Sequence, residues 1–366
     1  METTVPTEPI CALVWTGAQN FEFVALAEPE LHDGESLIRL NAATICGSDL
    51  HTISGRRSQP CPSVLGHEGA GVVVETKNPD LEIGQRVTFS VTAPCLECDR
   101  CQQGRTAKCR SVLKTGHEAF NSQWPLSGTY ATHILLRKNQ PVAVLSDAIA
   151  NTTASVASCA GATVMAAVEA GGDLRGQRVL IVGLGMLGLI ACDVAIQRGA
   201  SAVYASDPNP ERRQWASALG GVHAFDPAEE AVDSGSIDIA FDFSGVNAGV
   251  NTAISSLDIG GRAVLAGSVA TSAAINVNPE TLVRNWQTIT GVHNYEPRHL
   301  QEAVDFLAHS GIDWNAVISA PIALEEVPAT VEELINGDKD KDCKRYLRTA
   351  VVLSDGAAID KDLLRH

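Results

Sequence analysis

The sequence predicts an α/β protein with two domains, one built mainly of β-strands and one built on a doubly wound parallel sheet. Three observations predict this fold class. The chain has 366 residues, more than one hydrophobic core usually organises. Its first part holds short β-branched or alternating segments separated by turn residues, at 36–40, 71–75, 86–91 and 130–136. Beyond about Ala154, Ala-rich helical stretches alternate with short apolar runs, which is typical of buried parallel strands joined by helices.

The second domain is expected to alternate strands and helices. Its expected strands are the apolar runs 179–182, 202–206, 237–243 and 263–266, and 189–198 is the helix that follows the first of them. After Pro297 the pattern predicts two helices and a closing strand, at 300–308, 324–335 and 347–353. We expect residues 354–366 to fray or to pack on the surface.

Composition excludes several classes of function. Lys and Arg number 27 and Asp and Glu number 43, so the net charge is −16. A protein that binds nucleic acid or an anionic membrane surface would be basic. The longest apolar stretch, 179–192, contains glycines and is too short to span a membrane. The N-terminus lacks the basic start of a secretory signal. We therefore expect a cytoplasmic protein with a small-molecule partner, whose ten cysteines are reduced.

A glycine-rich turn follows the first expected strand of the second domain. The strand 179–182 runs into Gly183-Leu-Gly185-Met186-Leu187-Gly188, and a helix follows. In such a turn Gly183 permits the tight bend, Gly185 lets a pyrophosphate approach the backbone, and Gly188 lets helix and strand pack closely. The N-terminus of the helix then offers free N–H groups to the phosphates. The pattern predicts a dinucleotide site, and a glycine-rich turn without a ligand is the alternative.

Asp207 ends the next expected strand and discriminates between the two nicotinamide cofactors. A carboxylate there accepts hydrogen bonds from a ribose 2′-hydroxyl and repels a 2′-phosphate. The sequence therefore favours NAD over NADP. Arg212 and Arg213 lie just beyond and give NADP some favour.

Four cysteines lie close together in the first domain, at positions 95, 98, 101 and 109, within a lobe that spans 93–112. Four thiolates close a tetrahedral shell around zinc and leave no position for a substrate, so this spacing predicts a structural zinc site. An iron–sulfur cluster takes the same four ligands and is the competing interpretation.

A second group of residues is spread along the chain. It consists of Cys46-Gly-Ser48-Asp49-Leu-His51, Gly66-His67-Glu68 and Ser158-Cys159-Ala160. Each piece is ambiguous alone, because Cys159 suits a helix core and His67 suits a turn. Their order beside the cysteine lobe and the glycine turn is informative.

Together these motifs resemble the zinc-dependent medium-chain alcohol dehydrogenases, over residues 10–353. The motifs that carry the resemblance are Cys46–His51, Gly66–Gly71, the cysteine lobe, the glycine turn and Arg348-Thr349. The Cys-Gly-Ser-Asp form is closer to the polyol and threonine dehydrogenase branch. The resemblance implies a GroES-like catalytic domain from residues 1–158 and 297–366, a Rossmann domain at 159–296, and a homodimer or homotetramer.

The resemblance also implies roles for individual residues. Cys46, His67 and Cys159 are the implied ligands of a catalytic zinc, with water or substrate as the fourth, so that two zinc ions are expected per chain. Polyol dehydrogenases place a glutamate near Cys159, so this ligand follows the alcohol dehydrogenase pattern. Further implied roles are transient approach to the metal for Glu68, orientation of His67 for Asp49, a proton relay for Ser48 and His51, contact with the nicotinamide for Thr163, and contact with the pyrophosphate for Arg348. An ion pair with Glu68 is the alternative for Arg348, and an ordinary exposed histidine is the alternative for His51.

The substrate is the least constrained expectation. Arg56 and Arg57 follow His51 and suit an anionic substrate, unless they are simply solvated. The segment 284–297, with His293 and Asn294, is similar to a subgroup associated with phosphonate catabolism, which implies a hydroxyalkyl phosphonate. A polyol or threonine is the alternative substrate. A zinc-free reductase or a non-catalytic cofactor binder is a remote alternative, because those relatives lack the cysteines.

The other four cysteines, Cys11, Cys61, Cys192 and Cys343, are assigned to packing.

Overall fold

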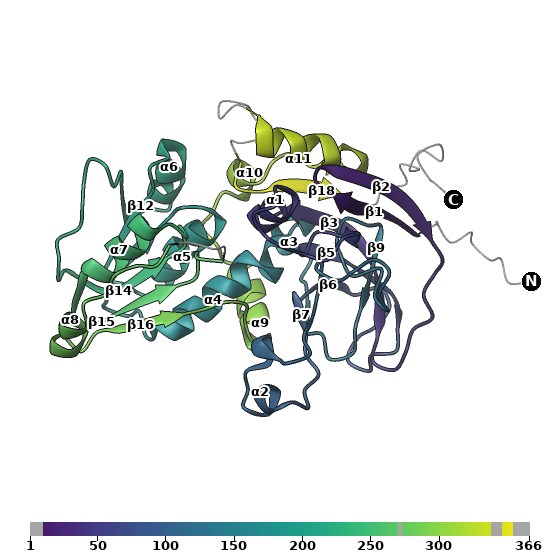
Figure 1. The fold of residues 1–366 in the computed structure, drawn as a ribbon, viewed down its shortest axis with the longest axis horizontal. Helices are drawn as coiled ribbons and strands as arrows, with labels where there is room; N and C mark the ends of the chain where they lie inside the picture. The colour runs from purple at the N-terminus through teal and green to yellow at the C-terminus, as the bar shows by residue number, and fades with distance from the viewer. Residues whose placement is uncertain (1–9, 270–272, 338–345, 354–366) are drawn as a thin grey trace, which may run out of the picture. The chain divides into compact units, whose positions relative to one another are not determined.

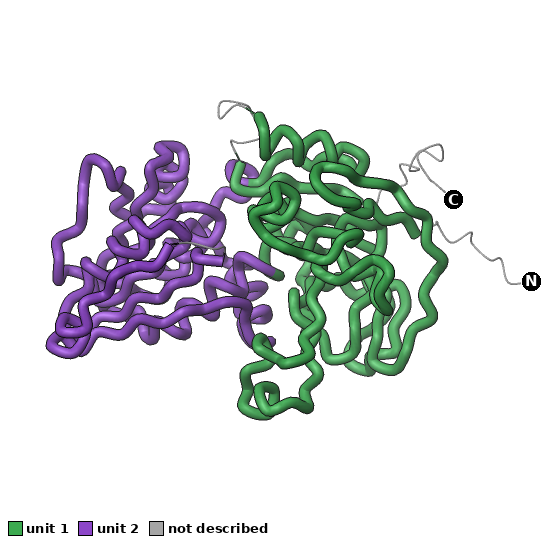
Figure 2. The backbone as a smooth tube through the Cα atoms, in the orientation of Figure 1, with its two compact units in different colours: residues 1–158, 318–366 green, residues 159–317 purple. Residues whose placement is uncertain are grey.

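The structure is a computed structural model that describes residues 10–269, 273–337 and 346–353. The chain divides into two compact units, Met1–Ser158 with Ile318–His366 and Cys159–Val317 (Figure 2). The first unit is therefore built from both ends of the chain.

The first unit is mainly β (Figure 1). Its larger sheet has the order β10-β6-β5-β3-β18-β17, with β9 paired to β3, and a smaller sheet has the order β2-β1-β4. The strands are β1 (Ile10–Gly17), β2 (Asn20–Leu26), β3 (Ser36–Ile45), β4 (Ser63–Val64), β5 (Gly69–Thr76), β6 (Arg86–Phe89), β7 (Thr92–Ala93), β8 (Leu113–Lys114), β9 (His133–Leu136), β10 (Val142–Val144), β17 (Ile322–Ala323) and β18 (Thr349–Val352). The helical elements are α1 (Gly47–Ile53), α2 (Asp99–Gln102), η1 (Thr106–Lys108), α3 (Asn151–Ser155), η2 (Val156–Ser158), η3 (Leu324–Glu326) and α11 (Val327–Asn336).

Strand β3 organises this unit because it pairs with β5, β9 and β18. Its apolar side chains, Ile38 and Leu40 among them, are fully buried in the core. Gly71 of β5 lies opposite Leu40, where a Cβ atom would overlap the carbonyl oxygen of Arg39. Strand β18 pairs Thr349 with Ile45, so the returning chain reaches the end of β3 just before Cys46.

The second unit holds the parallel sheet. All six strands are parallel, in the order β13-β12-β11-β14-β15-β16, and the direction of winding reverses between β11 and β14. The strands are β11 (Arg178–Val182), β12 (Ala202–Ser206), β13 (Val222–Phe225), β14 (Ile237–Asp242), β15 (Leu257–Leu265) and β16 (Thr288–Gly291). The helices are α4 (Ala160–Gly171), α5 (Met186–Gln197), α6 (Pro210–Ala218), α7 (Asn247–Ser255), α8 (Pro279–Arg284), α9 (Pro297–Leu307) and α10 (Trp314–Val317). The predicted fold class, a mainly β domain with a doubly wound parallel sheet, is confirmed.

Residues 297–317 differ from the expected division of the chain. The sequence assigned them to the second stretch of the β-rich domain, but they group with the second unit, and the return occurs at Ile318. The reason is that α9 packs against α4, where Arg298 forms a two-bond ion pair with Glu169 and His299 Nε2 lies 3.0 Å from the same carboxylate. Beyond α9, Ser310 Oγ donates to the buried Asp193 at 2.8 Å.

Some smaller expectations need correction. The helix expected at 324–335 begins with the 3-10 turn η3, and α11 starts only at Val327. Cys11 and Cys192 are buried as expected, whereas Cys61 is exposed, and no described cysteine is in a disulfide. Cys343 and the tail 354–366 lie outside the described residues.

Among the described residues, no single helix is long and apolar enough to cross a membrane. Helices Asn151–Ser158 and Ala160–Gly171 would pass that test as a pair, by length and composition only, but they are bent by 45°.

Candidate active site and metal centres

Cys46 lies where β3 ends and α1 begins, as the N-cap residue of that helix. Its backbone N–H donates to Oδ2 of Asp49 at 2.9 Å. The hydroxyl of Tyr130, a residue that is fully buried, donates to the same oxygen at 3.1 Å. These two bonds fix the Asp49 carboxylate beneath Cys46.

The other oxygen of Asp49 faces His67. Oδ1 lies 3.3 Å from His67 Nδ1, which is close enough for attraction but poorly aligned for a hydrogen bond. Metal-bound histidines usually turn one ring nitrogen to such a carboxylate and the other to the metal. Accordingly His67 Nε2 points away from Asp49 and lies 3.2 Å from Ser48 Oγ. The preceding Gly66 has φ +84°, and a Cβ atom there would overlap Thr129.

Charge around His67 favours protonation when no metal is present. Burial alone lowers the pKa of its imidazole, but the Asp49 carboxylate and Cys46 more than offset this, so the pKa lies well above its usual value. A metal that binds Nε2 must therefore displace a proton.

Cys159 directly follows Ser158, the last residue of the first unit's long segment. Ser158 Oγ donates to Ser155 O at 2.8 Å and accepts from Gly69 N at 3.3 Å, which positions the chain just before the cysteine. The ligand atoms of Cys46, His67 and Cys159 all lie within 4.8 Å of one another. Two thiol groups and an imidazole are the donors of an open catalytic zinc site, so this donor set fits zinc.

Glu68 and Arg348 form a buried pair beside Cys46. Arg348 Nε donates to Glu68 Oε2 at 2.7 Å and its Nη2 to Oε1 at 3.0 Å, a two-bond arrangement that also puts Nη2 3.5 Å from Cys46 Sγ. Thr44 Oγ1 adds a 2.6 Å bond to Glu68. Burial raises the pKa of Glu68, and the charge of Arg348 opposes that rise. The ion pair that the sequence analysis held as the alternative for Arg348 is thus present.

Ser48 and His51 lie three residues apart on α1, a spacing that brings side chains to one face of a helix. Ser48 Oγ is the one next to His67. His51 is half-buried, and its carbonyl accepts the Arg57 N–H at 3.0 Å. Both residues are half-buried, which is compatible with the proton relay that the resemblance implies.

The four cysteines of the lobe converge on one point. Cys95, Cys98, Cys101 and Cys109 form a group of donor atoms within 4.8 Å of one another. The Sγ–Sγ distances are 3.6 Å for Cys98–Cys101, 3.9 Å for Cys98–Cys109 and 3.4 Å for Cys95–Cys109. A zinc tetrahedron with bonds of about 2.3 Å has edges of about 3.8 Å, so the lobe fits zinc closely.

Backbone N–H groups point at these sulfurs. Those of Glu97 and Cys98 lie 3.4 Å from Cys95 Sγ, and that of Arg110 lies 3.5 Å from Cys98 Sγ. The bond from Glu97, ahead of the others, lowers the pKa of Cys95 to about 6, whereas burial raises the pKa of Cys101 to about 12. The backbone N–H groups therefore favour the thiolate of Cys95, whereas burial disfavours the thiolate of Cys101.

The glycine turn lies at the carboxyl end of β11 in the second unit. Gly183 has φ +90°, where a Cβ atom would come 2.7 Å from Ser244 N, and a Cβ at Gly188 would overlap Gly183 O. A Cβ at Gly185, by contrast, would meet nothing within 4 Å. Helix α5 begins at Met186, followed by Leu187, and no side chain caps its N-terminus. An open backbone cradle at an uncapped helix N-terminus fits a pyrophosphate.

Asp207 is buried just beyond β12 and braces this turn. Its carboxylate accepts the N–H of Leu184 and that of Asn209, both at 2.8 Å, and Arg212 Nη1 lies 3.5 Å away. Arg213 is occupied elsewhere, because its guanidinium binds Asp226 and the carbonyl of Asp207. The carboxylate expected to discriminate between cofactors therefore has one partly exposed cation beside it.

Three other predicted residues lie in the second unit. Thr163 is half-buried on α4, and His293 is exposed. Asn294 follows β16 in the left-handed region, with φ +60°, and its buried Nδ2 has no partner among the described residues. An orphaned donor at the carboxyl edge of the sheet is consistent with a ligand there.

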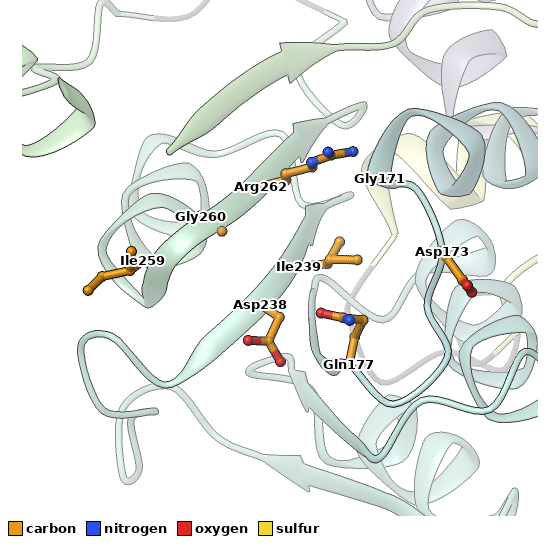
Figure 3. A pocket seen from close by; sticks show the side chains of 9 residues that line it. Gly171, Asp173, Gln177, Asp238, Ile239, Ile259, Gly260 and Arg262 are labelled. Atoms are coloured by element: carbon orange, nitrogen blue, oxygen red, sulfur yellow. The ribbon is translucent and has the colours of Figure 1, made fainter. Parts of the chain in front are cut away.

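A cavity of about 240 Å³ also opens in the second unit, and Figure 3 shows Gln177, Asp238 and Arg262 around it. Gln177 and Asp238 lie at the amino ends of β11 and β14, and Arg262 of β15 pairs with Ile239, the residue after Asp238. Ligands of doubly wound sheets bind at the carboxyl ends, where Gly183 and Asp207 lie. This cavity is therefore separate from the predicted cofactor site.

Sequence reasoning missed four residues that the structure places around the site. Tyr130 and Thr44 carry no local motif, because each looks like an ordinary strand residue. Lys114 and His117 follow the cysteine lobe, and the ring of His117 lies 5.5 Å from that of His67. Only the Gly-His pair at 116–117, which repeats the pair at 66–67, was a visible signal.

Comparisons with known proteins agree with this arrangement. The profile of the alcohol dehydrogenase GroES-like domain matches residues 32–147, and that of the zinc-binding dehydrogenase matches residues 187–309. An L-threonine 3-dehydrogenase of Pseudoalteromonas translucida is 26% identical, covering 86% of this chain and 93% of the relative. A sorbitol dehydrogenase of Bacillus subtilis is 25% identical, covering 92% and 96%. An alcohol dehydrogenase of Thermotoga maritima shares the fold, with a TM-score of 0.85 at 23% identity over 94% of this chain and 100% of its own.

The fold and the two domain profiles define an oxidoreductase of the zinc-binding dehydrogenase class. The chain belongs to the zinc-dependent medium-chain alcohol dehydrogenase family, in its polyol and threonine dehydrogenase branch.

Proposed function

We propose that this protein oxidises a small alcohol, and reduces the matching aldehyde or ketone, with NAD as the hydride carrier and zinc at Cys46, His67 and Cys159. The observation that carries this is the convergence of those three donors within 4.8 Å next to the hydroxyl of Ser48. When bound, zinc supplies Lewis-acid chemistry that lowers the pKa of a hydroxyl group, and NAD accepts the hydride.

The chain's own residues then hold the metal ligands and move the proton. Asp49, held by Tyr130 and by the Cys46 N–H, orients His67. Ser48 Oγ accepts the proton of the substrate hydroxyl as it gives up its own hydroxyl proton, and the His51 imidazole takes up the released proton and passes it to solvent, since imidazoles exchange protons readily near neutral pH. Glu68 is held by Arg348, so its proposed approach to the metal requires that this ion pair loosens.

Asp207 supports NAD as the preferred cofactor, because a buried carboxylate repels a 2′-phosphate. Arg212, 3.5 Å from it, lessens that repulsion and supports a minor activity with NADP. The turn Gly183–Gly188, with Met186 and Leu187 in the first turn of α5, is the proposed pyrophosphate site. Thr163 is the proposed contact with the nicotinamide, and His293 and Asn294 remain candidate substrate residues.

The cysteine lobe is proposed to hold a second, structural zinc. Its Sγ–Sγ distances of 3.4–3.9 Å suit zinc, and all four donors come from protein, so no position remains for a substrate.

The similarity to threonine and sorbitol dehydrogenases supports a polyol or a hydroxy-amino acid as the substrate. A hydroxyalkyl phosphonate is the other candidate and is included in the substrate panel described below. A homo-oligomer is also proposed, because Ile259, Val283 and Trp286 near the edge strand β16 are 75–85% exposed. Sedimentation analysis tests that assembly directly.

Initial rates test the proposed function. Zinc-loaded protein should reduce NAD faster than NADP with at least one alcohol of a panel of threonine, sorbitol, butanediol, hydroxy acids and hydroxyalkyl phosphonates. Metal analysis should find about two zinc ions per chain, and removal by a chelator should abolish turnover, which added zinc restores. Turnover that survives complete removal of zinc would contradict the proposal.

A further inference from the structure

Two loops of the first unit meet beside His67. Gln59, two residues after Arg57, donates its side-chain amide to Gly116 O at 2.7 Å. Gly116 stands between Lys114 and His117, and its N–H is held by Ser127 O at 2.7 Å. A Cβ atom at Gly116 would overlap Gly66 O, so the 114–117 turn rests directly on the turn that carries His67. The segment that carries Arg57 and the 114–117 turn thereby meet next to the turn that carries the proposed metal ligand.

His117 connects the basic residues to the metal site. Its ring centroid lies 5.5 Å from that of His67. Its Nδ1 lies 2.6 Å from Thr115 O, so Nδ1 carries the proton and donates to that carbonyl. The position of Gly116 and this bond together hold the ring in one orientation.

Two cations in this cluster have no counter-ion. Among the described residues, neither the Arg57 guanidinium nor the Lys114 ammonium group has a carboxylate within 4.0 Å, and both side chains are half-buried. Burial first, and the charge of Arg57 second, lower the pKa of Lys114, while Glu118 opposes them only weakly. Arg57 also adds to the lowering of the His117 pKa, after burial and His67. The two cations are therefore close enough to repel each other.

Such an arrangement costs free energy unless an anion joins it. Like charges in a partly buried site destabilise each other, and the cost grows as water is excluded. The chain as a whole carries a net charge of −16, so two neighbouring cations without a counter-ion are unusual in this protein. Arginine binds carboxylate and phosphonate groups through two parallel hydrogen bonds, and lysine adds a point charge.

We propose that Arg57 and Lys114 form an anion subsite of the active site, so that the preferred substrate is a short alcohol carrying a carboxylate or a phosphonate. The inference rests on the proposed function and deepens it by naming the substrate class. Arg56 is not part of the subsite, because its side chain is exposed and no described contact links it to the 114–117 turn.

Matched substrates test this subsite. One set is 4-hydroxybutyrate, 3-hydroxypropylphosphonate and 1-butanol, and a second set is 3-hydroxybutyrate and 2-butanol. Wild-type protein should show a kcat/KM about tenfold or more higher for the acid than for its neutral partner. Arg57→Gln and Lys114→Gln should each lower kcat/KM for the acids more than for the neutral alcohols, so that most of that preference is lost. Arg105→Gln, which removes an exposed charge of the same unit, is the matched control. Carboxylate and phosphonate rates tell the two anion types apart.

Direct binding separates this inference from the proposed function. Calorimetric titration of the zinc-loaded protein with acetate and with methylphosphonate requires no turnover. Binding of either anion, lost in Arg57→Gln and Lys114→Gln and kept in Arg105→Gln, supports the subsite even if no alcohol is oxidised. The subsite is overturned if neither anion binds wild-type protein at millimolar concentration, or if neutral alcohols are oxidised as fast as their acids. In that second case the dehydrogenase function still stands.

Discussion

The two cysteine-containing clusters differ in how far apart their donors lie in the sequence. Cys95 to Cys109 span one short lobe, whereas Cys46, His67 and Cys159 come from three distant places. The lobe is closed, with four sulfurs and supporting backbone N–H groups. The second cluster has only three donors, and a hydroxyl, a carboxylate and an arginine surround it. A closed shell holds structure, while an incomplete shell with titratable neighbours leaves room for chemistry.

Of the variants considered, Cys46→Ser should lower activity the most, because it removes a ligand of the three-donor cluster of Cys46, His67 and Cys159, called the open cluster below. A serine hydroxyl is a poor zinc ligand, and the metal contributes several kcal/mol of transition-state stabilisation, so kcat/KM should fall by about three orders of magnitude. The variant should still fold and bind NAD, as circular dichroism and fluorescence titration will show. If the Cys46→Ser protein is unfolded, the assignment of Cys46 to the catalytic zinc is contradicted, and a structural role is indicated instead.

Asp49→Asn should have the next largest effect. The amide keeps the shape of the carboxylate but removes the charge that faces His67 Nδ1, and such changes weaken metal affinity or activity by about 10–100-fold. Tyr130→Phe is the matched control, since it removes only one bond to the same carboxylate and should cost less. Equal losses in both variants would contradict the assigned order.

Zinc uptake by the open cluster should depend on pH. The pKa of His67 is raised in the metal-free protein, because Asp49 and Cys46 together more than offset the lowering by burial, so zinc must displace its proton. Protonation of His67 should therefore contribute up to about tenfold per pH unit to the fall in affinity below that raised pKa, in addition to the protons that zinc displaces from Cys46 and Cys159. Zinc titrations at several pH values, with an indicator that reports released protons, will measure this. Affinity that stays constant from neutral to acidic pH would refute it.

Cys98→Ser should have the smallest effect on kcat in the molecules that stay folded, because it leaves Cys46, His67 and Cys159 unchanged. Loss of one of four sulfurs opens the structural shell, so the zinc content should fall from about two to about one per chain. Proteolysis within 93–112 and a lower melting temperature are the expected signs. A variant with full stability and unchanged zinc content would show that the lobe is not a structural metal site.

Regular patterns made most of the fold predictable. The strand expected at 202–206 is β12 with identical ends, and 179–182 and 237–243 each differ from the observed strand by one residue. These strands are buried and continuously apolar, so burial and local preference agree. The structure groups residues 297–317 with the second unit, and the ion pairs of α9 with Glu169 that join them to it are not visible in the sequence. Of the two residues of the proposed anion subsite, the sequence indicated Arg57 but not Lys114. The Gln59–Gly116 bond, which brings their two segments together, joins residues far apart in the chain.

The sequence by itself determined the closed character of the cysteine lobe and the shape of the glycine turn, because each depends on residues a few positions apart, whereas the distant donors Cys46, His67 and Cys159 were implied by the resemblance to a known family. Only the tertiary structure decided that Tyr130 supports Asp49, that Arg348 pairs with Glu68 and that Lys114 lies beside Arg57. Those contacts join residues far apart in the chain. Their partners are selected by the register of β3 with β18 and by the packing of loops, which no local pattern encodes.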